Sequence, residues 1–225
     1  MGHSLELKKA KVLFFDINET ILDLDLLKKE INDIFSQDVF DLWFTKLLQE
    51  SLVLTITGTF ESFNQIAVNA LKQISAIKGV NLTDEKIDKL TDVLSLLPPY
   101  PDVADALKIL KKKGYTIVAL SNSSKDLLAR QLANAKIDHL FDQQISVELF
   151  CKYKPSKQVY QEAAGLLHAE TEECMLVAAH DWDVFGALCA GLRAVFVKRA
   201  GKGAYYFSRE PEFEADDLFS LAEQL

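Results

Sequence analysis

The chain has 225 residues, of which 49% are hydrophobic and 26% are charged, and its formal net charge is -8 at pH 7. This length and composition exclude a disordered chain and suffice for a large buried core with an insertion. The negative balance argues against a nucleic-acid partner, because phosphates require a basic field, but it leaves small anionic substrates open. No apolar run reaches the length of a membrane span, and Met1-Gly2-His3-Ser4 does not start a signal peptide.

The three cysteines Cys151, Cys174 and Cys189 are odd in number and lack CxxC spacing. Neither a disulfide framework nor a zinc site is therefore indicated. These features predict a cytoplasmic protein that acts on a small molecule, with no membrane or nucleic-acid partner.

The first predicted strand is the apolar run Val12-Leu13-Phe14-Phe15. Four consecutive apolar residues are typical of a strand that is buried on both faces. Asp16 follows the carboxyl end of this strand, and in open α/β sheets that edge faces the ligand crevice. Two interpretations of Asp16 stay open at this point: a nucleophile or metal ligand, and a helix cap.

An all-helical block interrupts the chain after this strand. Its predicted helices cover 24–36 and 39–54, a third follows a cap at Thr59 or Ser62, and a fourth begins at Thr83. The block ends at Pro98-Pro99-Tyr100-Pro101, which cannot continue a helix and would stiffen a hinge. We therefore expect a helical cap domain at 23–96 and an α/β core domain formed by 1–22 and 97–225.

Helices and strands alternate from residue 101 onward. The predicted elements are a helix at 102–113, a strand at 115–120, a helix opened by 121–124, a strand near 144–147, a helix at 156–167, a strand at 175–179, a helix at 183–190 and a strand at 194–197. Repeated βα units predict a Rossmann-like, doubly wound, mainly parallel sheet. Asp16, Ser121 and the segment 180–183 all follow strands, so they would meet at one sheet edge, with Lys154 supplied by a loop.

These polar residues support a nucleophilic reaction. An ammonium group at Lys154 would lower the pKa of Asp16 and keep it ionised for attack on carbon or phosphorus. Ser121 and Asn122, at a helix start, could donate hydrogen bonds to the attacked group. Asp183 would hold Lys154 or orient the water that hydrolyses the ester. The alternatives are helix caps at Ser121 and Asp183 and a solvated surface lysine at Lys154.

Four short motifs occur in the order and spacing of the haloacid dehalogenase superfamily. They are Asp16-Ile17-Asn18-Glu19-Thr20, Leu120-Ser121-Asn122, Tyr153-Lys154-Pro155 and Val177-Ala178-Ala179-His180-Asp181-Trp182-Asp183. With its helical insertion, the chain most resembles the type II 2-haloacid dehalogenase branch. The resemblance implies a cofactor-free hydrolase that forms an ester on Asp16 and converts a 2-haloacid into a 2-hydroxy acid and halide. Similar dehalogenases often pair, so it also implies a homodimer as one option.

Departures from the superfamily's phosphatases concern two positions. Asn18 stands where those enzymes usually carry an Asp that protonates the leaving oxygen, and an amide cannot do this. Ala178-Ala179 replaces their Gly-Asp, whose Asp helps to hold magnesium. Both changes favour metal-free carbon–halogen cleavage. The alternatives are a phosphatase with Mg²⁺ held by Asp16, Asn18 and Asp183, and a scaffold of the same fold without turnover.

A departure from the dehalogenases concerns the cap. Trp43-Phe44 matches a tryptophan-arginine pair whose arginine receives the halide, and no arginine precedes Arg130 in this chain. Small haloacids are then expected to bind weakly. Removing the substrate carboxylate from water costs more free energy than hydrogen bonds from neutral donors give back. His180, where the branch has Asn, is expected to pack or cap, or alternatively to act as a base. The expected substrate-binding residues are Asn18, Thr20, Phe44, Phe63, Asn122, Tyr160, His180 and Trp182.

Overall fold

The computed structural model describes residues 10–201 and 203–225. Within them, a parallel sheet has the strand order β3-β2-β1-β4-β5-β6. Its strands are β1 (Val12–Phe15), β2 (Thr116–Ser121), β3 (Gln143–Ser146), β4 (Cys174–Ala178), β5 (Arg193–Val197) and β6 (Phe213–Ala215). This order confirms the predicted Rossmann-like doubly wound sheet, and its switch point lies between β1 and β4. Residues 1–9 of the expected core segment, including the start examined for a signal peptide, lie outside the described residues.

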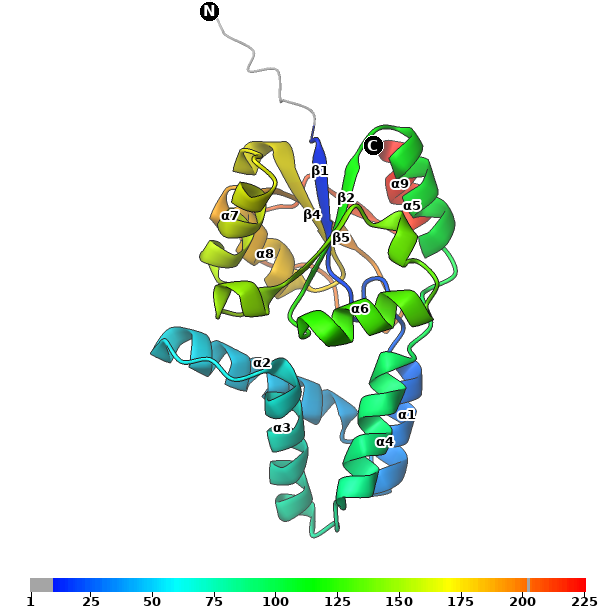
Figure 1. Ribbon diagram of the computed structural model, residues 1–225, viewed down its shortest axis with the longest axis vertical. Helices are drawn as coiled ribbons and strands as arrows, with labels where there is room; N and C mark the ends of the chain where they lie inside the picture. The colour runs from blue at the N-terminus through cyan, green and yellow to red at the C-terminus, as the bar shows by residue number, and fades with distance from the viewer. Residues whose placement is uncertain (1–9, 202) are drawn as a thin grey trace, which may run out of the picture.

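Helices cover both faces of the sheet. Helices α5 (Val103–Lys112) and α9 (Leu218–Gln224) pack together on one side, and α7 (Lys157–Leu166) and α8 (Asp181–Ala190) pack together on the other (Figure 1). Helix α6 (Lys125–Asn134) follows β2, and short 3-10 turns occupy Asp138–Leu140, Val147–Phe150 and Thr171–Glu173. The sequence patterns predicted neither β6 nor α9.

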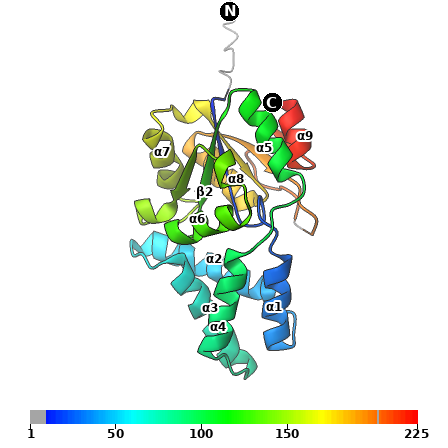
Figure 2. The same ribbon diagram turned by 45° about the vertical axis from the view of Figure 1, so that its right-hand side comes forward.

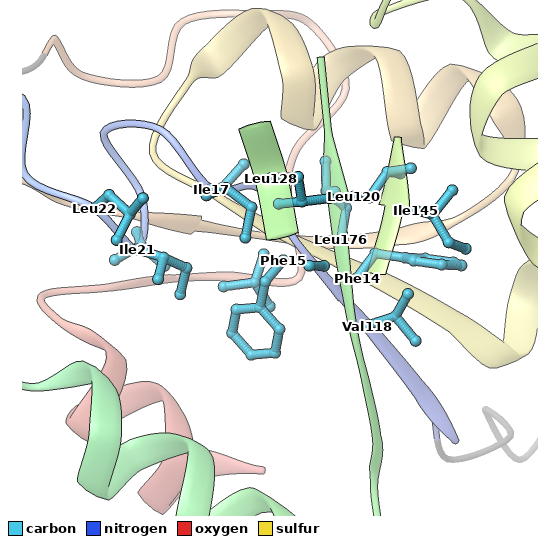
Figure 3. Packing of buried hydrophobic residues seen from close by; sticks show 14 of the residues in the cluster. Phe14, Phe15, Ile17, Ile21, Leu22, Val118, Leu120, Leu128, Ile145 and Leu176 are labelled. Atoms are coloured by element: carbon cyan, nitrogen blue, oxygen red, sulfur yellow. The ribbon is translucent and has the colours of Figure 1, made fainter. Parts of the chain in front are cut away.

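The core forms around β1, which pairs with β2 on one side and β4 on the other. All four of its residues are buried, which is the outcome expected for an uninterrupted apolar strand. Figure 3 shows Phe14 and Phe15 packed among side chains of neighbouring strands, including Leu120 and Leu176. The pairing continues through Asp16 N, which donates to Val177 O at 3.1 Å. The first polar side chain is thereby held at the carboxyl edge of the sheet.

Four helices lie between β1 and α5. They are α1 (Asp25–Phe35), α2 (Phe40–Thr57), α3 (Phe63–Lys78) and α4 (Asp84–Ser95), and they gather beyond the carboxyl edge of the sheet (Figures 1 and 2). Ser62, rather than Thr59, caps α3, and Thr83 caps α4. Trp43 Nε1 donates to Ala67 O at 3.0 Å and joins α2 to α3. No helix in the described part of the chain is both long and apolar enough to cross a bilayer.

Two paired segments connect the helical block to the sheet. Asp23 N donates to Pro98 O at 2.9 Å, and Tyr100 N donates to Ile21 O at 3.0 Å. Helix α6 also contacts the carboxyl end of α4, where Gln131 Nε2 donates to Leu94 O at 2.9 Å. These contacts flank the block at 23–96, whose behaviour as a separate cap domain stays a prediction.

Candidate active site

Asp16 lies at the carboxyl end of β1, and its side chain is 8% exposed. One carboxylate oxygen, Oδ1, accepts a hydrogen bond from Lys154 Nζ at 2.8 Å. The other, Oδ2, accepts from Thr20 Oγ1 at 2.8 Å. Asp16 does not cap a helix, since α1 begins at Asp25, so the helix-cap interpretation of Asp16 is wrong.

Lys154 reaches Asp16 from the loop that precedes α7, and its side chain is 1% exposed. Its ammonium also donates to Asp183 Oδ2 at 2.7 Å and to Leu120 O at 3.0 Å, so each of its three hydrogens has an acceptor. The loop is fixed by Asn122 Oδ1, which accepts from Lys154 N at 3.0 Å. The alternative of a solvated surface lysine is therefore wrong.

Asp183 is fully buried in the first turn of α8. It accepts hydrogen bonds from Lys154 through Oδ2 and from the Tyr160 hydroxyl through Oδ1. The cap position of α8 is His180, so the helix-cap interpretation of Asp183 is also wrong. Its neighbour along the helix, Gly186, allows Pro155 to approach, because an added Cβ would lie 2.3 Å from Pro155 Cβ.

The shared ammonium gives the two carboxylates different proton affinities. Burial raises the pKa of Asp16, but Lys154 and then His180 outweigh burial and hold this pKa well below its usual 3.8. Burial raises the pKa of Asp183 above 3.8, since Lys154 offsets it incompletely and the Asp16 charge adds to it. Burial lowers the pKa of Lys154, but Asp16 and Asp183 together raise it above 10.5. Asp16 therefore stays ionised as a nucleophile requires, beside a carboxylate that takes up a proton more readily.

His180 contacts a second carboxylate in addition to Asp16. Its Nδ1 lies 3.1 Å from Asp16 Oδ2, and its Nε2 lies 2.8 Å from Oε2 of the buried Glu19. The imidazole ring stacks with Phe44 of α2 at a centroid distance of 5.8 Å and with Trp182 at 5.2 Å. The expectation was that His180 packs or caps: the ring packs between aromatic side chains, and the side chain makes no capping bond to α8.

Sequence reasoning missed Glu19 although it lies three residues after Asp16. Its backbone has φ 63°, which is uncommon for a residue other than glycine. No periodic or motif signal marks this conformation. The proximity of an acidic residue to the candidate nucleophile was the available clue.

The remaining predicted site residues make other contacts. Ser121 ends β2, and its Oγ accepts from Ser123 N at 3.1 Å; Ser124 caps α6, so Ser121 is not its cap. The Asn18 amide donates to Ser123 Oγ at 3.1 Å. Phe63 packs on the Tyr153 ring at 5.6 Å. The structure thus brings Asp16, Thr20, Lys154, Tyr160, His180 and Asp183 into one network, with Phe44, Asn122 and Trp182 bordering it.

Arg199, which the sequence patterns did not indicate, supports the loop that follows Asp16. Its Nη2 donates to Thr20 O at 2.8 Å, and its Nη1 donates to Asp102 Oδ2 at 2.8 Å. The guanidinium also stacks on the Tyr100 ring at 4.1 Å. Arg199 is 8% exposed and committed to these partners, so it holds the Thr20 backbone rather than facing a substrate.

A pocket of about 320 Å³ lies between α2 and the Lys154 loop. Its lining includes Thr45, Leu48 and Leu52 of α2 together with Lys154, Pro155 and Trp182. The turn after α2 is attached nearby, because Tyr153 N donates to Thr55 Oγ1 at 3.1 Å and the Tyr153 hydroxyl donates to Glu61 O. A small, largely apolar molecule can therefore be enclosed beside Lys154.

The donor set does not suit magnesium. In the parts of the chain that the structure describes, no group of three His, Cys, Asp or Glu residues is arranged to hold a metal ion. The Lys154 ammonium lies between Asp16 and Asp183, and the Ala179 side chain carries no oxygen. A hard divalent cation requires several oxygen ligands, which these side chains do not supply.

The fold and site together define an α/β protein of the hydrolase class, with an acid and base cluster at the carboxyl edge of a doubly wound sheet and helices above it. The chain belongs to the haloacid dehalogenase-like hydrolase family, whose model matches residues 10–191. It is 30% identical over 215 residues to (S)-2-haloacid dehalogenase 1 of Pseudomonas sp. (strain CBS-3), covering 94% of each chain. It is 28% identical over 196 residues to the (S)-2-haloacid dehalogenase of Pseudomonas fluorescens, covering 86% of each. A crystal structure of a dehalogenase in an intermediate complex superposes with a TM-score of 0.89 at 25% identity, covering 96% of this chain and 97% of that one.

Proposed function

We propose that this hydrolase catalyses hydrolytic dehalogenation of a 2-haloacid. Asp16 displaces halide from the carbon and forms an ester; water then attacks the ester carbonyl and releases a 2-hydroxy acid. The observation that carries the proposal is the ionised Asp16 carboxylate, bonded to Lys154, which lines the pocket beside α2. A halide leaves as a stable anion, so its displacement needs neither a general acid nor a metal cofactor.

The hydrogen bonds around Asp16 favour Oδ1 as the attacking oxygen. Thr20 and His180 both contact Oδ2, whereas Oδ1 accepts from Lys154, which itself lines the pocket. A carboxylate oxygen with one donor keeps a lone pair for the carbon. The ester bond would therefore form at Oδ1, the oxygen bonded to Lys154.

Asp183 serves the second step in this mechanism. Once Asp16 is esterified, its charge is lost and Lys154 is left with Asp183 as its carboxylate partner. Water placed beside this pair attacks Cγ of Asp16, and its proton passes to Asp183, whose pKa is already raised by burial. Tyr160 keeps the Asp183 carboxylate in place through its hydroxyl.

The substrate class is supported by the relatives that act on (S)-2-haloacids. Phe44, however, stands where the resemblance would supply an arginine for the haloacid carboxylate. We therefore propose weak binding of small haloacids, with a KM raised relative to a variant in which Phe44→Arg restores the cation. Enclosing a carboxylate without a paired cation costs several kcal/mol, of which each neutral donor returns about 1 kcal/mol.

The test is halide release from 2-chloropropionate by the wild type, with and without EDTA, beside the Asp16→Asn variant. We expect release that EDTA does not affect and a loss of about 10³-fold or more in the variant, with the fold retained. A single turnover in ¹⁸O-labelled water should place the label in Asp16. Magnesium-dependent hydrolysis of p-nitrophenyl phosphate without halide release would reject the proposal, and so would an active Asp16→Asn variant.

A further inference from the structure

Both ring nitrogens of His180 face carboxylate oxygens, Asp16 Oδ2 at 3.1 Å and Glu19 Oε2 at 2.8 Å. A carboxylate accepts hydrogen bonds and donates none. The imidazole can therefore hydrogen-bond to both partners only when both of its nitrogens carry a hydrogen. Phe44 and Trp182 stack against the ring and fix its plane. The site therefore holds an imidazolium whose Nδ1–H is aimed at the nucleophilic carboxylate.

Glu19, whose side chain lies against His180 Nε2, has a strained backbone. The residue has φ 63° and is 3% exposed. This left-handed conformation is unfavourable for a residue with a Cβ, and such strain persists where the surrounding structure determines it. The observed result of this conformation is a buried carboxylate bonded to His180 Nε2.

The second donor on Asp16 Oδ2 is equally fixed. The Thr20 hydroxyl donates to Oδ2 at 2.8 Å and accepts from Ala179 N at 2.9 Å, which orients its hydrogen toward Asp16. When Oδ1 is esterified, Oδ2 becomes the carbonyl oxygen of the ester. Attack by water then places negative charge on Oδ2, at the atom where two donors already lie within the range of an oxyanion hole.

We propose that His180 is a catalytic residue of ester hydrolysis, donating from Nδ1 to the oxyanion that forms at Asp16 Oδ2, and that Glu19 is its positioning residue. The inference rests on the proposed function. In the step, the water oxygen bonds to Cγ of Asp16, its proton passes to Asp183, and the carbonyl electron pair moves to Oδ2. The pair then returns, the Cγ–Oδ1 bond breaks, and the leaving alkoxide takes the proton back from Asp183. The new carboxyl group loses one proton to solvent, so a haloacid and water give a hydroxy acid, halide and a proton.

The electrostatics around His180 support this role. Burial lowers the pKa of His180, but its bonds to Asp16 and Glu19 outweigh burial and raise that pKa to about 9. Esterification removes the Asp16 charge, so Glu19 then carries the task of keeping the ring protonated. The groups packed on the ring are the carboxylates of Asp16 and Glu19 and the rings of Phe44 and Trp182, with Lys154 and Asp183 beyond Asp16.

The test separates the two chemical steps by rapid quench with 2-chloropropionate. Halide release reports ester formation, and the mass of the peptide that carries Asp16 reports the ester and its decay. In His180→Gln we expect the first turnover of halide to persist while the ester accumulates and decays about 10²–10³-fold more slowly. The matched control is His139→Gln, at an exposed histidine outside the site, which should decay at the wild-type rate.

Glu19→Gln tests positioning through the pH profile of ester decay. The amide can still accept from Nε2 but no longer holds the proton, so the high-pH limb of the decay rate should shift to lower pH. Because the protonated ring is the active form, the rate should recover toward the wild type on the acid side. A rate lowered equally at every pH would overturn the role of Glu19, and wild-type ester decay in His180→Gln would overturn that of His180. Wild-type protein that releases no halide and carries no ester would instead reject the proposed function, and this inference with it.

Discussion

Lys154 is a buried ammonium that serves two carboxylates at once. It is 1% exposed and lies 2.8 Å from Asp16 Oδ1 and 2.7 Å from Asp183 Oδ2. An exposed ion pair contributes about 0–1 kcal/mol to the free energy of unfolding. Removing one partner of a buried pair costs about 3–5 kcal/mol, because the remaining charge is buried with neither a counter-charge nor water around it. The charge of the nucleophile and the stability of the core therefore depend on the same side chain.

Lys154→Met should destabilise the protein by about 3–5 kcal/mol near neutral pH. Wild-type Asp16 has a lowered pKa, so its stabilising contribution is present above 3.8 and is lost as the pH falls through the lower folded value. Without Lys154, Asp183 has no cation beside it, so burial and the Asp16 charge raise its pKa further, and its protonation reduces the loss of stability as the pH falls. Urea unfolding at about pH 8 and about pH 5 should show a smaller loss of free energy at the acidic value. Lys157→Met, at an exposed lysine, is the control; an equal loss at both pH values would contradict the prediction.

The meeting of Asp16 and Asp183 could be predicted from a local rule, whereas Lys154 was expected from a loop and from the Tyr153-Lys154-Pro155 motif of the resemblance. Asp16 and Asp183 come after apolar strands, and parallel strands bring their carboxyl ends to one edge. The partners of His180 could not be predicted. One partner depends on the left-handed backbone of Glu19, which no residue pattern predicts. Another is Phe44, which stacks on the ring from α2, a helix outside the α/β part of the chain.

At the scale of elements, α8 approaches the Lys154 loop so closely that a side chain at Gly186 has no room. An added Cβ would lie 2.3 Å from Pro155 Cβ and 2.9 Å from the Tyr160 hydroxyl. Both residues adjoin the network, since Pro155 follows Lys154 and Tyr160 bonds to Asp183. The packing of a helix thus sets the position of the charged groups.

Gly186→Ala should therefore lower stability by about 1–3 kcal/mol through overpacking. Halide release should fall with it, because Pro155 must shift and carry Lys154 away from Asp16. Gly165→Ala in α7 is the control: nothing lies within 4 Å of its added Cβ, and the change should stabilise the helix by about 0.5–1 kcal/mol. Thermal unfolding and a halide assay measure both effects. Wild-type stability and activity in Gly186→Ala would contradict this account.

The helices were the most predictable elements, because their apolar residues recur with a period of 3.6 over ten or more residues. Elements too short to show a hydrophobic period were not predicted from the sequence. Strand β6 has three residues and α9 has seven, and α9 depends on a capping box between Asp217 and Ser220. The start of α6 was also placed too early, since Ser121 extends β2 and the helix begins at Lys125.

At the scale of the whole molecule, side-chain contacts attach two of the helices before α5 to the α/β part of the chain. Tyr153 holds the carboxyl end of α2, and α6 holds the carboxyl end of α4. The pocket beside Lys154 is lined by α2, Lys154, Pro155 and Trp182, so its shape depends on the position of α2. The homodimer expected from the resemblance stays a prediction, which sedimentation velocity of the purified protein can test.

The net charge of -8 gives a prediction for the proposed haloacid reaction. For a sphere of about 20 Å radius, this charge repels a monovalent anion at the surface by about 1 kcal/mol at an ionic strength of about 10 mM and by about 0.5 kcal/mol at about 150 mM. The kcat/KM for 2-chloropropionate should therefore rise about twofold between these conditions. The uncharged 2-chloropropionamide feels no such repulsion and is the matched control. If kcat/KM for 2-chloropropionate fell as the ionic strength rose, a local positive field at the pocket would outweigh the net charge of the protein.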